Sequence, residues 1–125
     1  MNGCLILAFI FMYSIAETQT DSAKSEIGIA SYYAKKFEGR RCASGQIFKQ
    51  DSLTAAHKSL KFGTMVKVTN LNNDSSVIVR INDRLPRNSK RKIDLSLRAA
   101  KQLNFVKYGL VKVKIEVLLD SVFVR

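Results

Sequence analysis

The sequence predicts an all-β domain, a small β-barrel with one or two short helices. Apolar and polar side chains alternate over residues 65–69, 77–81 and 110–119, as in strands that bury one face. A stretch of Asn, Asp and Ser separates the first two runs, which predicts a hairpin. At 125 residues, the chain can form one hydrophobic core but not two. These observations together favour short strands closed into one barrel.

The N-terminal residues 1–16 resemble a secretory signal peptide. They form an uncharged, mostly apolar run that ends in a small-x-small pattern at Ser14 and Ala16. The run is shorter than the roughly 20 residues that a membrane-spanning helix needs. We therefore expect cleavage after Ala16 and export, the alternative being a buried helix of the domain. Cys4 lies at the front of the run and not at its end, so no lipid anchor is expected.

The remaining elements follow in chain order. Polar residues 17–26 predict a flexible lead-in, so the folded domain is expected over residues 27–125. Late in the chain, Asp94 or Ser96 can cap a short helix with an apolar stripe. Strands are expected at residues 28–33, 65–69, 77–81 and 110–119.

The charge of the chain restricts its partners. Its 21 basic and 10 acidic residues give a formal net charge of +11, which attracts nucleic acid, anionic lipid or an acidic cell-wall polymer. Nucleic acid is not expected as a partner, because export separates the protein from it and no basic motif with interleaved aromatic residues is present. The basic segment 87–92 is expected either to bind carboxylates at the edge of a cleft or to form a solvated turn.

The cysteine and histidine content argues against a metal site and an internal disulfide. Once residues 1–16 are removed, Cys42 is the one remaining cysteine. His57 is the single histidine, and it cannot build a metal site alone, so no metal or other cofactor is expected. A single histidine can orient a carboxylate or a sugar, although it is more often a packed or surface residue.

Asp83 is a candidate for proton transfer. Val77, Val79 and Ile81 recur at every second position, and on regular strand geometry Asp83 continues their buried face. Burial removes water from a carboxylate and disfavours its charged form, which suits it to act as an acid near neutral pH. The alternative is that the strand ends earlier and Asp83 begins a turn before Pro86.

Six blocks of the sequence resemble the rare lipoprotein A (RlpA) family in their order and spacing. Among them are Ala-Ser-Gly, Thr-Ala-Ala-His and Asn-Asp-Arg, and the six blocks lie at residues 28–33, 39–45, 54–64, 66–71, 79–86 and 93–96. The resemblance implies a six-stranded double-psi β-barrel. It also implies a lytic transglycosylase that cleaves the glycan strands of bacterial peptidoglycan, with a preference for strands without stem peptides, in the periplasm or cell envelope during daughter-cell separation.

The same resemblance implies the site residues. The family's acid falls on Asp83 and its histidine on His57, both expected in the active site. A lytic transglycosylase needs no attacking water, so Asp83 could protonate the leaving oxygen and then accept the proton of the sugar's 6-hydroxyl as a 1,6-anhydro ring closes. Four substrate-binding residues are expected in or directly beside these blocks, namely Ser44, Gln46, Asn82 and Arg84.

One departure from the family bears on catalysis. The family has Glu after Ala-Ser-Gly, and this chain has Gln46, which cannot exchange a proton. The alternative function is therefore a wall-binding or expansin-like module without catalysis. A thiol enzyme that uses Cys42 with His57 and Asp83 is a third possibility. We expect the protein to act as a monomer on peptidoglycan, with Asp83, His57 and Gln46 in one pocket.

Overall fold

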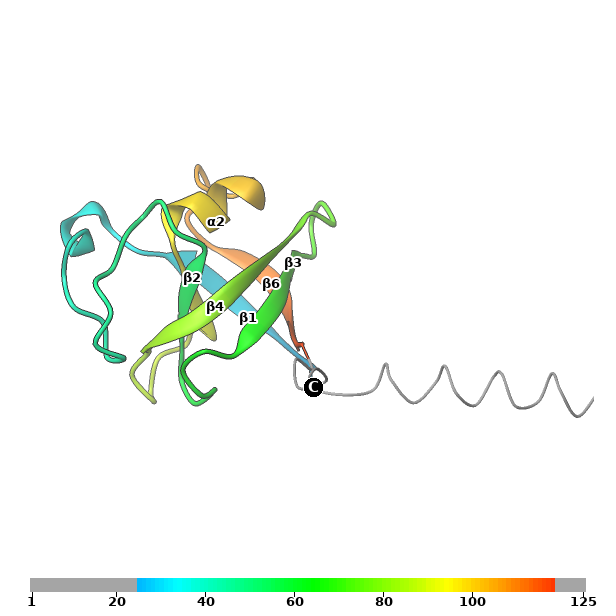
Figure 1. Cartoon of the computed structure of the whole chain (residues 1–125). Helices are drawn as coiled ribbons and strands as arrows, with labels where there is room; N and C mark the ends of the chain where they lie inside the picture. Colours follow the sequence, from blue (N-terminus) through cyan, green and yellow to red (C-terminus); the bar gives the residue numbers. More distant parts are fainter. Residues whose placement is uncertain (1–24, 119–125) are drawn as a thin grey trace, which may run out of the picture.

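The structure is a closed barrel of six strands, described by a computed structural model over residues 25–118 (Figure 1). Neighbouring strands follow the order β1-β5-β2-β4-β3-β6 around the barrel. The pairs β1–β5 and β2–β4 are parallel, and the other four pairs are antiparallel. The strands are β1 (Ser25–Tyr32), β2 (Thr54–His57), β3 (Met65–Asn70), β4 (Ser76–Arg84), β5 (Ile93–Leu95) and β6 (Val111–Val117). The expected all-β barrel is confirmed.

The predicted hairpin between β3 and β4 is also confirmed. Val66 pairs with Val79 and Val68 with Val77, so the alternating apolar residues of both strands point into the barrel. Buried side chains from all six strands and the helix that follows β5 form one core, which includes Ala30, Ala55, Val66, Val68, Val79, Ile81, Ile93, Leu95, Leu103, Phe105, Val113 and Ile115.

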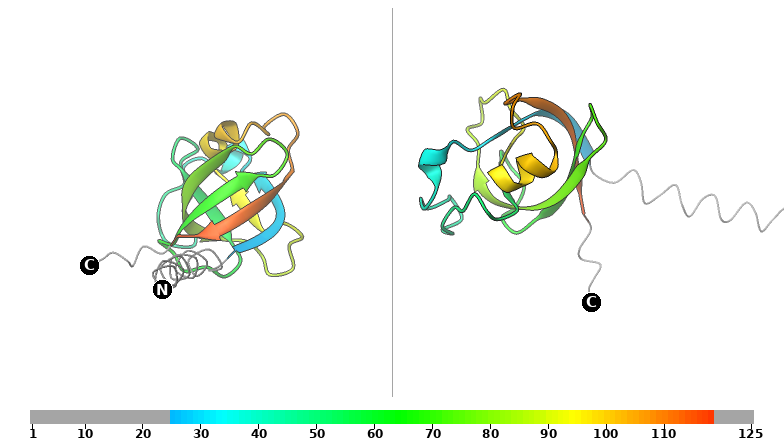
Figure 2. Two further views of the ribbon diagram at one scale, coloured as in Figure 1. Left: turned by 90° about the vertical axis from the view of Figure 1, so that its right-hand side faces the viewer. Right: turned by 90° about the horizontal axis from the view of Figure 1, so that it is seen from above.

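One short helix covers an end of the barrel, as the right-hand view of Figure 2 shows. This helix, α2 (Leu97–Gln102), follows Ser96, whose Oγ accepts a hydrogen bond from the backbone N–H of Ala99. The choice between Asp94 and Ser96 as the cap is thereby settled for Ser96, because a short polar side chain before the first turn satisfies a free N–H. The buried residues Ala99, Ala100 and Leu103 lie against the core.

Three local features differ from the sequence prediction. β1 begins at Ser25, two residues before the expected domain boundary, because Ser25 and Glu26 pair with β6. Residues 54–57 and 93–95 form β2 and β5, two short strands that the sequence pattern did not predict. The segment Lys35–Phe37 forms a turn of 3₁₀ helix, η1, within the loop that joins β1 to β2.

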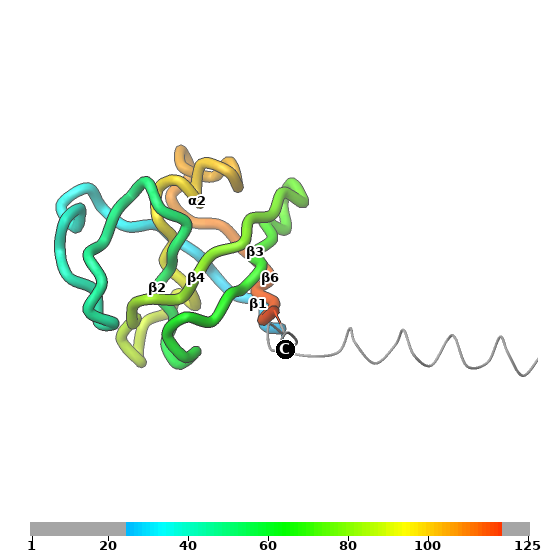
Figure 3. The backbone as a smooth tube through the Cα atoms, in the orientation of Figure 1, coloured from blue at the N-terminus to red at the C-terminus, as the bar shows by residue number. Residues whose placement is uncertain are grey.

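Three loops place the candidate site on one side of the barrel. The long β1–β2 loop projects from that side, and the chain path in Figure 3 places the loops after β2 and β4 near it. The expected signal peptide lies outside the described residues, as does most of the expected lead-in. Within residues 25–118, no helix has the length and apolar character needed to cross a membrane.

Candidate active site

A β-bulge in β4 sets the orientation of Asp83. Ala55 pairs with Ile81 but the next residue, Ala56, pairs with Asp83, so Asn82 is one extra residue in β4. Consecutive residues of β2 face opposite sides, and paired residues share a side. Ile81 therefore faces the core, whereas Asp83 faces outward with Ala56. The expectation that Asp83 continues the buried face of the strand is wrong, because the bulge reverses the alternation. The alternative of a turn at Asp83 is also wrong, since β4 continues to Arg84.

Both carboxylate oxygens of Asp83 accept a hydrogen bond. The Tyr33 hydroxyl donates to Oδ2 at 2.5 Å, and the backbone N–H of Ala43 donates to Oδ1 at 2.7 Å. Tyr33 follows β1, and its ring stacks on Phe48 with the ring centroids 4.1 Å apart. The carboxylate is thus half-buried and held in place from two sides by the β1–β2 loop.

A tight turn over residues 42–46 brings this loop to the bulge. The N–H of Cys42 donates to the Gln46 carbonyl at 2.7 Å, and Gly45 adopts a φ of 97°, which a glycine accommodates without strain. The N–H of Ser44 donates to the Asn82 carbonyl at 3.3 Å, and Nδ2 of Asn82 donates to Oε1 of Gln46 at 3.1 Å. The structure therefore brings Ser44, Gln46 and Asn82 together beside Asp83.

The surroundings of Asp83 keep two neighbouring groups protonated. Burial, together with the hydrogen bond to Asp83 and its negative charge, raises the pKa of Tyr33 far above its usual value, so the phenol remains a donor. Cys42 is 7% exposed. Burial, then the charge of Asp83 and a hydrogen bond to it, raise the pKa of the Cys42 thiol to about 11. Because a nucleophilic cysteine needs the thiolate, this geometry disfavours the thiol enzyme.

His57 lies on the opposite face of β2 from Ala56 and Asp83, and it is 5% exposed. Its Nδ1 accepts hydrogen bonds from the backbone N–H groups of Ser59 and Leu60, each at 3.1 Å. Nε2 must therefore carry the proton, and it donates to Oε2 of Glu26 at 2.7 Å. Among the described contacts, none joins His57 to Asp83. The expectation that Asp83, His57 and Gln46 share one pocket is therefore wrong for His57, which instead holds the β2–β3 loop. Gln46 lies beside Asp83 through its contact with Asn82.

The predicted substrate-binding residue Arg84 is also engaged elsewhere. It is exposed, and its guanidinium lies 4.2 Å from the centre of the Phe62 ring, a cation–π contact with the β2–β3 loop. Its Nη1 donates to the His57 carbonyl at 3.4 Å. Arg84 therefore connects the end of β4 to this loop.

Sequence reasoning missed two residues of the site, Tyr33 and Asp94. Asp94 pairs with Ser31 on one side and with Ala56 on the other, so Ser31, Asp94, Ala56 and Asp83 form one outward-facing row across four strands. Asp94 accepts hydrogen bonds from Nε and Nη2 of Arg91 at 2.7 and 3.0 Å, which raise the pKa of Arg91. Asp94 lies in the family block at residues 93–96, but only the strand pairing shows that it is in line with Asp83.

A metal site of at least three acidic, histidine or cysteine side chains does not occur within residues 25–118. A comparison with known protein families matches residues 25–115 to the family described as "Lytic transglycolase". The chain belongs to this family. The lytic transglycolase match covers every strand of the barrel except the end of β6, and it includes Asp83 and the loop that binds it.

Curated relatives of this lytic transglycolase domain are longer proteins. The endolytic peptidoglycan transglycosylase RlpA of Haemophilus influenzae is 50% identical over 100 residues, covering 78% of this chain and 35% of that protein. The probable endolytic peptidoglycan transglycosylase RlpA of Treponema pallidum is 52% identical over 88 residues, covering 70% of this chain and 28% of that protein. The chain therefore spans about a third of the length of the curated relatives it matches.

Solved structures share the fold of the lytic transglycolase domain. The Streptomyces papain inhibitor superposes with a TM-score of 0.63 at 21% identity, covering 77% of this chain and 96% of that one. An expansin of Clavibacter michiganensis, solved in complex with cellohexaose, superposes with a TM-score of 0.63 at 18% identity, covering 78% and 52%. At these identities the likeness concerns the fold alone, and it confirms the expected double-psi β-barrel.

Proposed function

We propose that the protein is an endolytic transglycosylase that cleaves the glycan strands of peptidoglycan and leaves 1,6-anhydro ends. The observation that carries the proposal is the position of Asp83, a half-buried outward-facing carboxylate within the part of the chain that matches the lytic transglycolase family. Relatives at 45–52% identity that are named endolytic peptidoglycan transglycosylases support the substrate and the reaction.

The geometry allows Asp83 to act first as acid and then as base. The carboxylate has four lone pairs, so the hydrogen bonds from Tyr33, Ala43 and Cys42 still leave one of them free to exchange a proton. A protonated Asp83 gives its proton to the glycosidic oxygen as the bond from that oxygen to C1 breaks. The 6-hydroxyl oxygen then bonds to C1, and its proton returns to Asp83. Tyr33 and Ala43 act as positioning groups, because they fix the plane of the carboxylate through both steps.

We further propose that the protein is exported to a bacterial cell envelope and acts there as a monomer. The apolar run at residues 1–16 supports export. The formal net charge of +11 suits a wall polymer that carries carboxylates.

Digestion of purified glycan strands tests the proposal. The full chain is expected to release fragments with 1,6-anhydro ends, detected by mass spectrometry, and Asp83→Asn is expected to release none. Reducing ends in place of anhydro ends would indicate hydrolysis and contradict the proposal. Binding without any cleavage would instead support the wall-binding module, for which Gln46 is the specific observation, since its amide accepts a hydrogen bond from Asn82 but cannot exchange a proton.

A further inference from the structure

A groove of about 500 Å³ lies beside the bulge, between the β1–β2 loop and the outer face of β2 and β4. We call it the Arg80 groove. Six of its eight lining residues are polar or charged, and those used below are Gln46, Lys49, Thr54, Arg80 and Asn82.

Two buried oxygens in this wall have no hydrogen-bond partner within the protein. They are Oγ1 of Thr54 and Oδ1 of Asn82, and they are the only buried side-chain oxygens or nitrogens of residues 25–118 in this state. Asn82 is 4% exposed. Because buried polar groups are nearly always paired, two unpaired acceptors in one groove point to a ligand that offers hydroxyl or amide N–H donors.

The same groove carries two free cations. Arg80 and Lys49 are both exposed, and neither takes part in the four ion pairs that the structure gives for residues 25–118. Two unpaired cations beside unpaired acceptors suit a ligand that also carries a carboxylate.

The basic segment 87–92, which the sequence analysis proposed as a carboxylate-binding edge, is partly occupied. Arg91 binds Asp94 through two nitrogens, and Nζ of Lys92 lies 3.7 Å from Oε1 of Glu26. The carboxylate-binding role therefore fits the Arg80 groove better than this segment.

Strand pairing places the Arg80 groove next to the reacting carboxylate. Thr54 pairs with Arg80, and two residues further along β2, Ala56 pairs with Asp83. Residues two apart on a strand share a face and lie about 7 Å from each other. Asp83 does not line the groove, but a polymer bound in it can extend along β2 to reach Asp83.

We propose that the Arg80 groove is a subsite for the carboxylate-bearing amino sugar of the glycan strand. Arg80 and Lys49 bind the lactyl carboxylate of this sugar, which is free when no stem peptide is attached. The oxygens of Thr54 and Asn82 accept hydrogen bonds from its hydroxyl and acetamido N–H groups. The inference rests on the proposed function for its substrate, and it adds the residues that recognise the free carboxylate.

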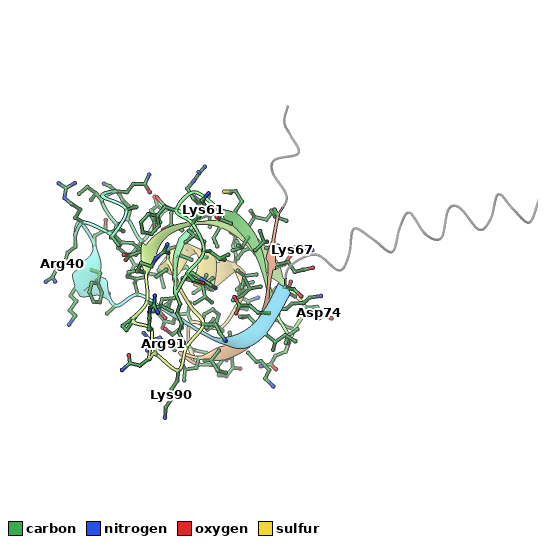
Figure 4. The ribbon with its side chains drawn as sticks, turned by 90° about the horizontal axis from the view of Figure 1, so that it is seen from below. Arg40, Lys61, Lys67, Asp74, Lys90 and Arg91 are labelled. Carbon is green, nitrogen blue, oxygen red and sulfur yellow. The ribbon has the colours of Figure 1, made fainter. Side chains whose placement is uncertain are left out.

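Binding measurements with three probes test the subsite. The probes are a peptide-free glycan fragment with free lactyl carboxylates, the same fragment after amidation of those carboxylates, and a chitin oligosaccharide that has none. The full chain is expected to bind the first probe about tenfold more tightly than the other two by titration calorimetry. In the double variant Lys49→Gln/Arg80→Gln, that difference is expected to disappear. Lys112→Gln is the matched control, because Lys112 is an exposed cation of β6, which borders neither β2 nor β4. Lys67, which Figure 4 shows across the barrel from Arg40, is less suitable because its strand pairs with β4 and Lys67 lies two residues from the partner of Arg80.

A second variant, at Thr54, tests the unpaired oxygens without changing the charge of the groove. Thr54→Val keeps the shape of the side chain and removes its hydroxyl, so we expect it to weaken the free and amidated fragments alike, by roughly three- to tenfold. Equal affinity for all three probes in the unmodified chain would overturn the proposal, as would discrimination that persists in the double variant. A fragment with an intact stem peptide that binds as tightly through Arg80 would assign the groove to a peptide carboxylate and overturn the lactyl assignment.

The outcomes also separate this subsite from the proposed function. Charge-dependent binding without 1,6-anhydro products would support the subsite while the transglycosylase proposal fails. Anhydro products without any effect of Lys49→Gln/Arg80→Gln would support the transglycosylase while the subsite fails.

Discussion

The hydrogen bond between Tyr33 and Asp83 is expected to contribute measurably to the free energy of unfolding. A hydrogen bond to a charged group contributes about 1.5–3 kcal/mol to the free energy of unfolding, and Tyr33 donates one such bond to the carboxylate at 2.5 Å. We therefore expect Tyr33→Phe to destabilise the barrel by roughly 1.5–3 kcal/mol. Asp83→Ala is expected to cost more, since Ala43 also loses its acceptor. In the double variant, the two losses should overlap by about 1.5–3 kcal/mol, because the same bond is removed in both single variants.

Urea unfolding at pH 7 measures this coupling. Far-UV circular dichroism is the appropriate probe, because the chain contains no tryptophan and both variants alter the surroundings of tyrosine. Tyr32→Phe is the matched control, since the hydroxyl of Tyr32 donates to the Val106 carbonyl at 2.7 Å and not to Asp83. The loss of unfolding free energy caused by Tyr32→Phe should therefore add fully to the loss caused by Asp83→Ala. Additive losses for Tyr33→Phe and Asp83→Ala, within about 0.5 kcal/mol, would refute the reasoning.

The further predictions concern Cys42, Gln46 and His57. Because the pKa of Cys42 is raised to about 11, alkylation of its thiol in the folded protein should be slow at pH 8 and accelerate towards pH 11. The same shift stabilises the fold fully below pH 9.0, the usual pKa of the thiol, and this stabilisation should be lost as the pH rises to about 11. Cys42→Ala should keep glycan cleavage, and an inactive variant would favour the thiol enzyme. Gln46→Glu should raise the yield of anhydro products, because a glutamate oxygen can still accept from Asn82 and adds an exchangeable proton; an unchanged yield would remove Gln46 from the reaction. His57→Ala should lower stability by about 2–3 kcal/mol in the same urea assay, because two backbone N–H groups and Glu26 lose a partner; unchanged stability with lost cleavage would restore His57 to the active site.

Periodicity predicted the elements whose side chains alternate strictly. The β3–β4 hairpin and β6 follow this pattern, because each buries one face against the core. β2 and β5 did not stand out, since they have four and three residues and their pairing depends on neighbours distant in sequence. Their residues Ala55 and Leu95 are completely buried, yet no local signal distinguishes these segments from a loop.

The candidate site was predictable in its residues but not in its geometry. Six blocks identified Asp83 and Gln46, and the structure brings both to the bulge. The orientation of Asp83 could not be predicted, because one extra residue in β4 reverses the alternation. Tyr33 contributes to the site through its hydrogen bond to Asp83, which is 50 positions away in the sequence. Local sequence patterns cannot predict a contact over this separation.

The bulge supplies an extra residue in β4, and that residue attaches the β1–β2 loop to the strand that carries the reactive group. Deletion of Asn82 alone would restore regular pairing with β2 and leave the carboxylate facing outward beside Ala56. It would, however, remove the carbonyl that accepts from Ser44 and the amide that donates to Gln46. Redesign of this strand for new substrates must therefore keep the residue between Ile81 and Asp83, together with its amide side chain, because the turn over residues 42–46 is anchored to it.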